Sequence, residues 1–460
     1  MQIRTTLNRV IAATIIIALS VWILVTRPDR GLQVASVLVS HTLCSEVFVA
    51  GLPADQSFRE ELAFRPGFRR LARFVRYTVD RQRQQVTTTI AGLFGSRAVY
   101  RGAYGCVAVH GREPTRVPVP GSALDTTADT AVAPTSEALQ SAVDRAFTER
   151  PGQPPRQTTA VIVLHDGQIV AERYAPGYGV HTPLLGYSAT KSVTNALIGI
   201  LVRQGTLSVD QPAPVPEWAS STDPRHAITI DELLRMTSGL DFDEDGPGLG
   251  RPDRMFFLEP DMARFAARTP PLAKPGTRWA YSSCNTLLLD RIIRDAAGGD
   301  AGSVLRFARH ELFDPAGMRD VTLEFDNADT PVGALSMLAP ARAWARFGQL
   351  YLDDGVVAGR RILPDGWVQY SASPTLDHDY GAGFWTNRGL RGDARARVRR
   401  GMPDDAFYAS GLLGQRIVVI PSRRLVIVRM GRSQEWPAAD IAGLLDLVRD
   451  VVAASPQSPR

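Results

Sequence analysis

The sequence predicts an α+β fold, with an antiparallel sheet built from both ends of the region 155–455 and flanked by helices, plus a helical subdomain. Near the start of this region, two apolar runs, 160–164 and 169–173, flank Asp166-Gly167, a dipeptide typical of a hairpin turn. Near its end, 415–420 and 425–430 form a second such pair. Between them, from position 188 to about 370, the pattern is largely helical, so we expect the strands to come from the two ends.

The helices follow from apolar spacing. A helix is expected to start near Ser188, because apolar residues recur at helical intervals after it: Val193, Ala196, Leu197, Ile200 and Leu201. Residues 230–236 and 343–352 are expected to form two more helices. A closing amphipathic helix is predicted from Ile441, Leu444, Leu445, Val448 and Val452. These helices supply the layers that would cover the sheet.

The N-terminal part divides into three predicted segments. Residues 1–30 are expected to be a membrane anchor, because an apolar run from Val10 to Val25 is flanked by arginines. A cleaved signal peptide ending at Ser20 is the alternative, but the apolar run continues beyond that position. Residues 31–115 form a small region, and 116–154 read as a linker rich in Pro, Thr, Ala and Asp.

The net charge and the three cysteines bear on which classes of function are possible. A net charge of +5 on 460 residues does not argue for nucleic-acid binding. The arginine-rich stretch 65–83 alternates apolar and polar residues into 86–90, which predicts two strands with solvated faces; a membrane-surface role is the second interpretation. Of the three cysteines, Cys44 and Cys106 are the candidate disulfide and Cys284 is left free; the alternative is three unpaired buried thiols. Their spacing predicts no metal site.

Lysine usage marks a candidate catalytic site. The chain has 52 Lys and Arg residues, and only two of them, Lys191 and Lys274, are lysines. Arginine stays protonated at any workable pH, whereas a lysine amine can lose its proton and act as a base. Lys191 stands three residues after Ser188, one helical turn away, so its amine can reach the serine hydroxyl. The competing interpretation is a serine helix cap followed by a surface lysine.

Four segments together resemble the serine beta-lactamase and penicillin-binding protein family, in its class C and esterase-like (6-aminohexanoate-oligomer hydrolase-like) branch. They are Ser188-Ala-Thr-Lys191, Thr237-Ser-Gly-Leu240, Pro275-Gly-Thr-Arg-Trp-Ala-Tyr281-Ser-Ser-Cys-Asn285 and Tyr408-Ala-Ser-Gly411. The resemblance covers roughly residues 155–455, which implies a beta-lactamase/transpeptidase-like fold and a serine hydrolase domain there. Motifs of alpha/beta-hydrolases, phosphate-binding loops and nicotinamide enzymes are absent from the sequence.

The resemblance assigns expected roles to residues. Ser188 would be the nucleophile, with Lys191 and Tyr281 taking its proton. The N–H groups of Ser188 and Leu412 would hold the oxyanion beside Gly411 and Ser410, and either Ser283 or Asn285 would orient the substrate amide. Where the family usually carries a lysine or histidine, this chain has Ala409, which cannot hold a substrate carboxylate. Arg416 is a candidate replacement cation; its alternative is an exposed strand residue.

The sequence therefore predicts a membrane-anchored serine hydrolase that cleaves an ester or amide bond through a Ser188 acyl-enzyme, without metal or organic cofactor. Its expected partners are a small-molecule ester or amide and the bacterial inner membrane, with the catalytic domain in the periplasm and no nucleic acid. The alternative function is a non-hydrolytic penicillin-binding-like protein that recognises cell-wall peptides, motivated by the altered third motif.

Overall fold

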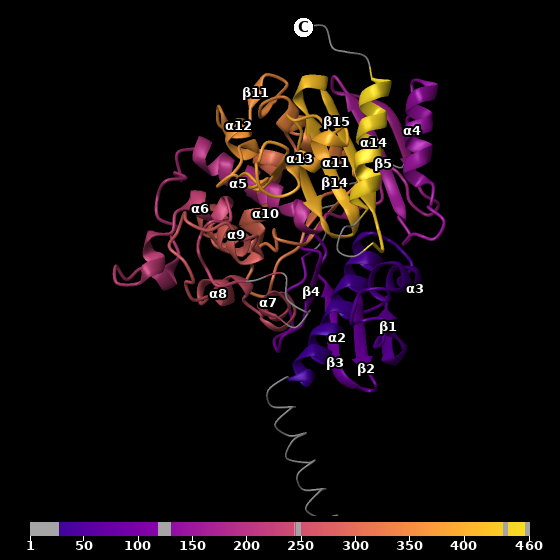
Figure 1. Cartoon of the computed structure of the whole chain (residues 1–460). Coiled ribbons are helices and arrows are strands. Elements are labelled where there is room, and N and C mark those ends of the chain that lie inside the picture. Colours follow the sequence, from indigo (N-terminus) through magenta and orange to yellow (C-terminus); the bar gives the residue numbers. More distant parts are fainter. Residues whose placement is uncertain (1–26, 118–129, 243, 245–249, 436–439, 456–460) are drawn as a thin grey trace, which may run out of the picture.

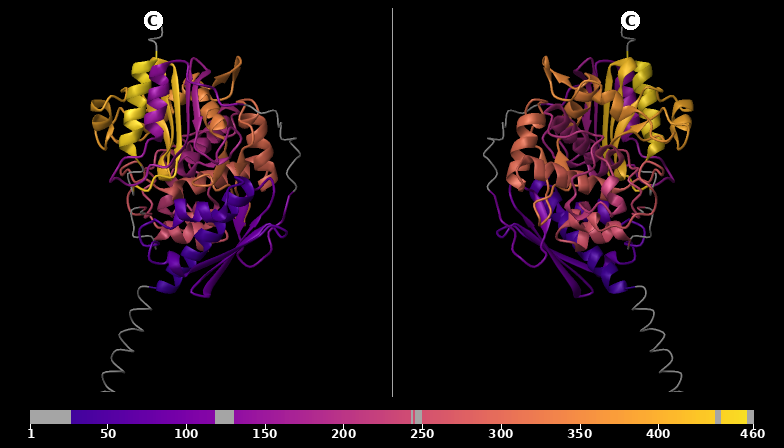
Figure 2. Two further views of the ribbon diagram at one scale, coloured as in Figure 1. Left: turned by 90° about the vertical axis from the view of Figure 1, so that its right-hand side faces the viewer. Right: turned by 90° about the vertical axis from the view of Figure 1, so that its left-hand side faces the viewer.

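The computed structural model describes residues 27–117, 130–242, 244, 250–435 and 440–455. The predicted anchor run, Val10 to Val25, lies outside these residues. Figure 1 shows a larger domain (residues 130–455) above an N-terminal module (residues 27–117). The views in Figure 2 place the start of α2 and the end of α14 at opposite ends of the molecule.

A six-stranded antiparallel sheet runs through the larger domain and confirms the predicted fold class. Its strand order is β12-β13-β14-β15-β5-β6. The strands are β5 (Thr158–His165), β6 (Gln168–Tyr174), β12 (Trp385–Thr386), β13 (Phe407–Gly411), β14 (Gln415–Ile420) and β15 (Leu425–Gly431). Strand β15 pairs with β5, so the two ends of the domain meet in the middle of the sheet. Both predicted hairpins are present, and Asp166 and Gly167 take the positive φ values, 48° and 78°, that a type I′ turn needs.

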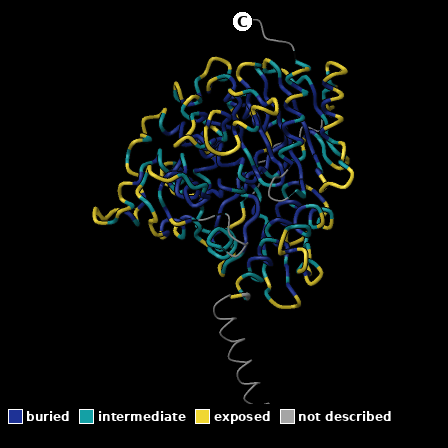
Figure 3. The backbone as a smooth tube through the Cα atoms, viewed as in Figure 1, coloured by how far each residue is buried: buried dark blue, intermediate teal, exposed yellow. Residues whose placement is uncertain are grey.

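Helices cover both faces of this sheet, so its interior strands β5, β14 and β15 are buried almost throughout. Figure 3 shows this buried interior in dark blue, with the exposed residues in yellow around it. On one face, Ile162 and Val426 join a core shared with α5 (Thr190–Arg203) and α11 (Ala341–Leu352). On the other face, Val161 and Ile427 pack against α4 (Glu137–Phe147) and α14 (Ile441–Ala454), which lie side by side in Figure 1.

Helix α4 lies inside the range 116–154 that the sequence predicted as a linker, and here the structure differs from the expectation. Ser136 caps the helix by accepting a hydrogen bond from the Leu139 N–H. One apolar face, made by Leu139, Ala142, Val143 and Ala146, is buried against the sheet and α14. This burial turns residues 137–147 into part of the larger domain.

The helical subdomain is built around α9 (Ser283–Ala297), which contacts α5 and the neighbouring helices. Those neighbours are α6 (Ile230–Leu234), α8 (Met262–Ala267) and α10 (Ala301–Ala308), with α7 (Arg251–Leu258) beyond α8. A small sheet of order β7-β9-β8 joins the subdomain to the main sheet, with β7 (Leu184–Leu185), β8 (Thr322–Leu323) and β9 (Met337–Ala339). The remaining elements are β10 (Val356–Val357), β11 (Arg360–Arg361), α12 (Trp367–Ala372) and α13 (Ala394–Arg399).

The N-terminal module consists of a four-stranded sheet covered by α2 (Pro28–Cys44). Its strands, in the order β1-β2-β3-β4, are β1 (Val75–Asp80), β2 (Gln85–Ile90), β3 (Leu93–Tyr100) and β4 (Cys106–Ala108). The two strands predicted from the arginine-rich stretch are β1 and β2. A short helix, α3 (Ala54–Ser57), and two π-helical turns, Ser45–Val49 and Phe58–Leu62, complete the module.

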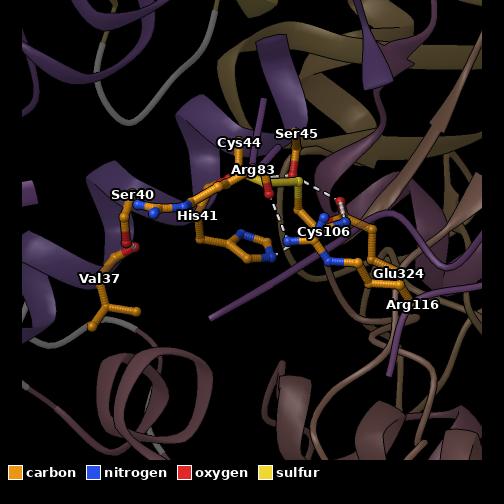
Figure 4. The surroundings of a disulfide bond; sticks show 9 residues. All are labelled: Val37, Ser40, His41, Cys44, Ser45, Arg83, Cys106, Arg116 and Glu324. Atoms are coloured by element: carbon orange, nitrogen blue, oxygen red, sulfur yellow. Dashed lines mark hydrogen bonds and ion pairs between the residues drawn. A yellow bond between two sulfur atoms is a disulfide. The ribbon is translucent and has the colours of Figure 1, made fainter. Parts of the chain in front are cut away.

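A disulfide joins Cys44 at the end of α2 to Cys106 in β4, with 6.0 Å between the Cα atoms, while Cys284 is free and buried. Figure 4 shows that Glu324 of the larger domain reaches this disulfide. Its Oε1 accepts hydrogen bonds from Ser45 Oγ (2.7 Å) and from the Cys106 N–H (2.8 Å). The disulfide therefore lies at the contact between module and domain.

Among the described residues, one segment, Asp29–Val49, is long and apolar enough to cross a membrane by length and composition. In the structure, 67% of the most apolar part of this segment is buried inside the protein. The segment packs as the core helix of the module, because α2 lies against β2 and β3, and Val39 and Leu43 share one apolar cluster with the sheet residues Val86 and Ala98.

Candidate active site

Ser188 lies in a short 3₁₀ turn, Tyr187–Ala189, between strand β7 and helix α5. The helix begins two residues later, close to where the apolar spacing predicted it. Tyr187 takes a left-handed backbone conformation, with φ at 48°. A non-glycine residue rarely adopts this conformation, and holding it costs on the order of 1–3 kcal/mol that the surrounding contacts must offset. The turn leaves the Ser188 side chain half-buried, beside the amine of Lys191.

Lys191 is 3% exposed, and its Nζ donates to Ser188 Oγ at 3.0 Å and to the carbonyl of Ala334 at 2.9 Å. Its Nζ also lies over the ring of Tyr281, 5.0 Å from the ring centroid. No carboxylate of the described residues is within ion-pair distance of Lys191 Nζ. The structure thus brings together Ser188, Lys191 and Tyr281, the three residues expected to carry out proton transfer.

Behind Lys191, a buried carboxyl ties α5 to α9. Thr194, three residues along α5, donates to Asp290 Oδ1 at 2.8 Å, and Asp290 lies on α9. Burial raises the pKa of the Asp290 carboxyl well above its usual range. Because Tyr281 lies two residues before the start of α9, this link helps to hold Tyr281 in place relative to Lys191.

Aromatic rings form one wall of the site. Tyr281 stacks on Trp385 with ring centroids 5.7 Å apart, and meets Tyr380 edge to face at the same separation. Trp279 continues the wall and stacks on His378 at 4.5 Å. Sequence reasoning did not anticipate this wall, because Trp385, Tyr380 and His378 lie far from Tyr281 in the chain.

The end of β13 touches the turn that carries Ser188. A Cβ atom built on Gly411 would lie 2.0 Å from the carbonyl oxygen of Gly186, so only glycine allows this approach of two backbones. Gly186 also donates its N–H to Met337 of β9 at 2.8 Å. Leu412 is the residue after Gly411, and Ser188 is two residues after Gly186, so the contact between the glycines lies next to both. Ser410 is half-buried and lies opposite Arg416 in the sheet register.

Asn285 is 1% exposed and braces a loop, because its Oδ1 accepts a hydrogen bond from Ser238 Oγ at 2.8 Å. Ser283, the first residue of α9, is also buried, and its N–H donates to the carboxylate of Glu244. The hydrogen bond between Ser238 and Asn285 joins the motif Thr237–Leu240 to the first turn of α9. Two motifs that are distant in the sequence are therefore one structural unit.

Arg416 is buried, so the alternative interpretation of this residue as an exposed strand residue is wrong. The reason is that β14 is an interior strand, paired with β13 on one side and β15 on the other. The guanidinium donates to the carbonyls of Gly411 (2.7 Å) and Gln415 (2.8 Å), and burial lowers the pKa of Arg416. Across the part of the chain that the structure describes, there is no cluster of three metal-ligating side chains.

Comparison with known proteins identifies the class to which this fold and site belong. Residues 143–449 match the Beta-lactamase family, so the chain belongs to that family and is a serine hydrolase. The disulfide between Cys44 and Cys106 is typical of proteins that fold outside the cytoplasm and favours an extracytoplasmic location.

Among individual relatives, the chain is 26% identical over 310 residues to the 6-aminohexanoate-dimer hydrolase of Paenarthrobacter ureafaciens, covering 62% of this chain and 74% of that one. Among solved structures, it is similar to a penicillin-binding protein homolog from Caulobacter crescentus, at 17% identity and a TM-score of 0.55, covering 71% of this chain and 99% of the other. It is also similar to a family VIII carboxylesterase, at 14% identity and a TM-score of 0.54, covering 69% and 97% of the two chains. These two structures share the fold.

Replacing Gly411 by alanine tests the backbone contact with Gly186. We expect Gly411→Ala to lower the free energy of unfolding by about 1–3 kcal/mol, because the new methyl group meets a backbone oxygen that has no room to move. Gly95→Ala in β3 is the matched control, since nothing lies within 4 Å of its Cβ position. Urea unfolding of the two variants measures the difference, and equal stabilities would contradict the contact.

Proposed function

We propose that this protein cleaves an ester or amide bond through an acyl-enzyme on Ser188. The single observation that carries the proposal is the hydrogen bond of 3.0 Å between Lys191 Nζ and Ser188 Oγ, made by a buried lysine. A hydroxyl becomes a useful nucleophile when a neighbouring base takes its proton, and a buried amine can do so.

In the proposed mechanism, Ser188 Oγ attacks the carbonyl carbon of the substrate while its proton passes to Lys191, with Tyr281 as the second proton carrier. The developing oxyanion accepts hydrogen bonds from the N–H groups of Ser188 and Leu412, which the contact between Gly186 and Gly411 holds near each other. The protonated base then gives its proton to the leaving group. Water attacks the acyl-enzyme in the second half of the reaction and restores the Ser188 hydroxyl.

We further propose a substrate that the site does not bind through a carboxylate. Ala409 cannot pair with a substrate carboxylate, and the guanidinium of Arg416 is engaged with two carbonyls. The aromatic wall of Tyr281, Trp385 and Trp279 suits an apolar or planar group. The similarity to a 6-aminohexanoate-dimer hydrolase favours esters or linear amides over beta-lactams. Ser283 is the proposed substrate contact, because the amide oxygen of Asn285 is occupied by Ser238.

A second candidate is a binding protein for cell-wall peptides that forms no acyl-enzyme. Ala409 in the third motif favours it, since the usual cation is missing there. The two functions differ in one measurable respect, because a pocket without an activated serine is not acylated.

Ser188→Ala is expected to abolish both hydrolysis of simple aryl esters and labelling by a fluorophosphonate probe, with the fold intact. The lost oxygen is one atom at a helix start, worth only about 0.5–2 kcal/mol of stability. Peptide mapping of the labelled wild-type protein identifies the modified residue. A label on another residue, or none on the wild type, would contradict the acyl-enzyme and favour the binding protein.

The variant Lys191→Arg tests whether Lys191 acts as a base or only supplies a positive charge. Arginine keeps the charge but has a pKa above about 12, so it cannot accept the proton of Ser188. We expect the acylation rate per folded site to fall by a factor on the order of 10² to 10⁴. Because Lys191 is buried, the larger guanidinium should also lower the free energy of unfolding by about 1–3 kcal/mol. Lys274→Arg, at the only other lysine of the chain and exposed, is the matched control and should be silent. Equal acylation rates in both variants would show that Lys191 acts as a charge only.

We also propose that residues 1–26 anchor the protein in the inner membrane with the larger domain outside the cytoplasm. The apolar run from Val10 to Val25 and the disulfide support this location. The full-length protein should sediment with membranes, and a variant that starts at Arg27 should be released as an active, soluble protein. Mass analysis that finds a mature terminus after Ser20 would replace the anchor by a cleaved signal.

A further inference from the structure

The residue in front of the nucleophile reaches into the N-terminal module. Tyr187 is buried, and its hydroxyl donates to the carboxylate of Glu61 and accepts from Arg65 Nη2 at 2.9 Å. The Arg65 guanidinium also lies 5.9 Å from the centroid of the Tyr187 ring. Glu61 and Arg65 belong to the module, in and just after the turn Phe58–Leu62. The family match begins at residue 143, so both partners of Tyr187 lie outside it.

Glu61 is itself held in a buried cluster of charges. Arg432, which directly follows β15, forms ion pairs with Glu46, with Glu60 (3.4 Å) and with Glu61 (3.8 Å). Burial, followed by the nearby charge of Glu46, raises the pKa of the Glu61 carboxyl above its usual range. A buried cluster of this kind is costly to rearrange, because removing one partner leaves an unpaired charge away from water. The hydroxyl of Tyr187 is therefore bound to a rigid support.

Apolar contacts bring the same two parts together. Ala50 and Leu52 of the module pack against Leu338 of β9, and Leu185 of β7 lies against the same cluster. A small cavity at this junction is lined by residues of the module, of the nucleophile turn and of the segment that follows β13: Glu46, Glu61, Tyr187, Leu413, Gln415 and Arg432 are among them. The module thus lies directly behind both parts of the site that act on the substrate carbonyl.

The backbone conformation of Tyr187 gives this contact a consequence for catalysis. A tyrosine at φ 48° is in a strained backbone conformation, and a relaxation toward negative φ would turn the next residue, Ser188. A displacement of about 1 Å between reacting groups costs roughly 10²-fold in rate. Two polar bonds at the far end of the ring oppose this rotation.

We propose that Glu61 and Arg65 are positioning residues for the nucleophile, acting through the Tyr187 hydroxyl, and that the N-terminal module is in this way a working part of the active site. The inference rests on Ser188 being the nucleophile, as proposed above. It gives residues 31–115 a role that their own sequence does not reveal.

The test compares three variants in the full-length protein. Tyr187→Phe removes the hydroxyl, Glu61→Ala removes its acceptor, and Glu61→Gln keeps an acceptor oxygen. Glu60→Gln is the matched control, since Glu60 touches Arg432 but not Tyr187. The readout is the burst of acyl-enzyme formation with an aryl ester, in which the amplitude counts folded, competent sites and the rate constant reports how well Ser188 is positioned.

We expect the rate constant to fall roughly 10- to 100-fold in Tyr187→Phe and Glu61→Ala, with KM changed by less than about threefold. Glu61→Gln should recover most of the rate, and Glu60→Gln should match the wild type. A lower amplitude at an unchanged rate constant would overturn the proposal, because it is the signature of lost folding alone.

If Glu61→Ala fails to fold, the rate constants of Tyr187→Phe and Glu61→Gln are compared instead, since both substitutions are nearly isosteric. A wild-type rate in Tyr187→Phe would overturn the positioning role. A wild-type protein that shows no burst and no label on Ser188 would instead overturn the proposed function, so the two failures are distinguishable.

Discussion

The contact between two glycine backbones, Gly186 and Gly411, determines the geometry of the whole site. The Ser188 turn reaches the site from β7, and β13 reaches it from the main sheet. A side chain at Gly411 would clash with the Gly186 carbonyl oxygen, so the two backbones could not approach each other this closely. The carbonyl of Gly186 lies against Gly411 of β13, and the N–H of Gly186 donates to Met337 of β9. Gly186 itself follows β7, so three strands from distant parts of the chain meet at this residue.

The buried arginines of this protein have structural roles that suit a guanidinium better than an ammonium group. Arg156 pairs with Asp440 at 2.8 Å, and Arg397 pairs with Asp379 at 2.9 Å, all four side chains being buried. A planar guanidinium with five donors can satisfy several buried carbonyls and carboxylates at once, and it stays charged. Lys191 is the buried exception, with a serine hydroxyl and a carbonyl as its hydrogen-bond acceptors. Among the buried cations of the described residues, the arginines hold the fold and Lys191 is the one that can exchange a proton.

Local patterns in the sequence were enough to predict the hairpins of the main sheet, the start of α5 and strands β1 and β2. Each depends on turn chemistry or apolar spacing within about a dozen residues. Helix α4 was missed although its apolar spacing is present, because the Pro- and Thr-rich stretch before it dominated the interpretation. The partners of Tyr187 could not be predicted, since Glu61 lies 126 residues away and only the tertiary fold joins them. Ala334 contributes a backbone carbonyl, which no side-chain pattern can reveal.

The ion pair between Glu46 and Arg432 joins residues that are 386 positions apart. During synthesis, the module leaves the ribosome first and its buried counter-charge leaves almost last. Until then, the buried carboxylates of Glu46 and Glu61 lack the Arg432 guanidinium that compensates their burial, so we expect the module to complete its packing only after Arg432 has been made. Contacts of such long range also form late, after the loop between them has closed. The first part of the chain to be made is thus expected to reach its final packing only after one of the last strands, β15, is in place.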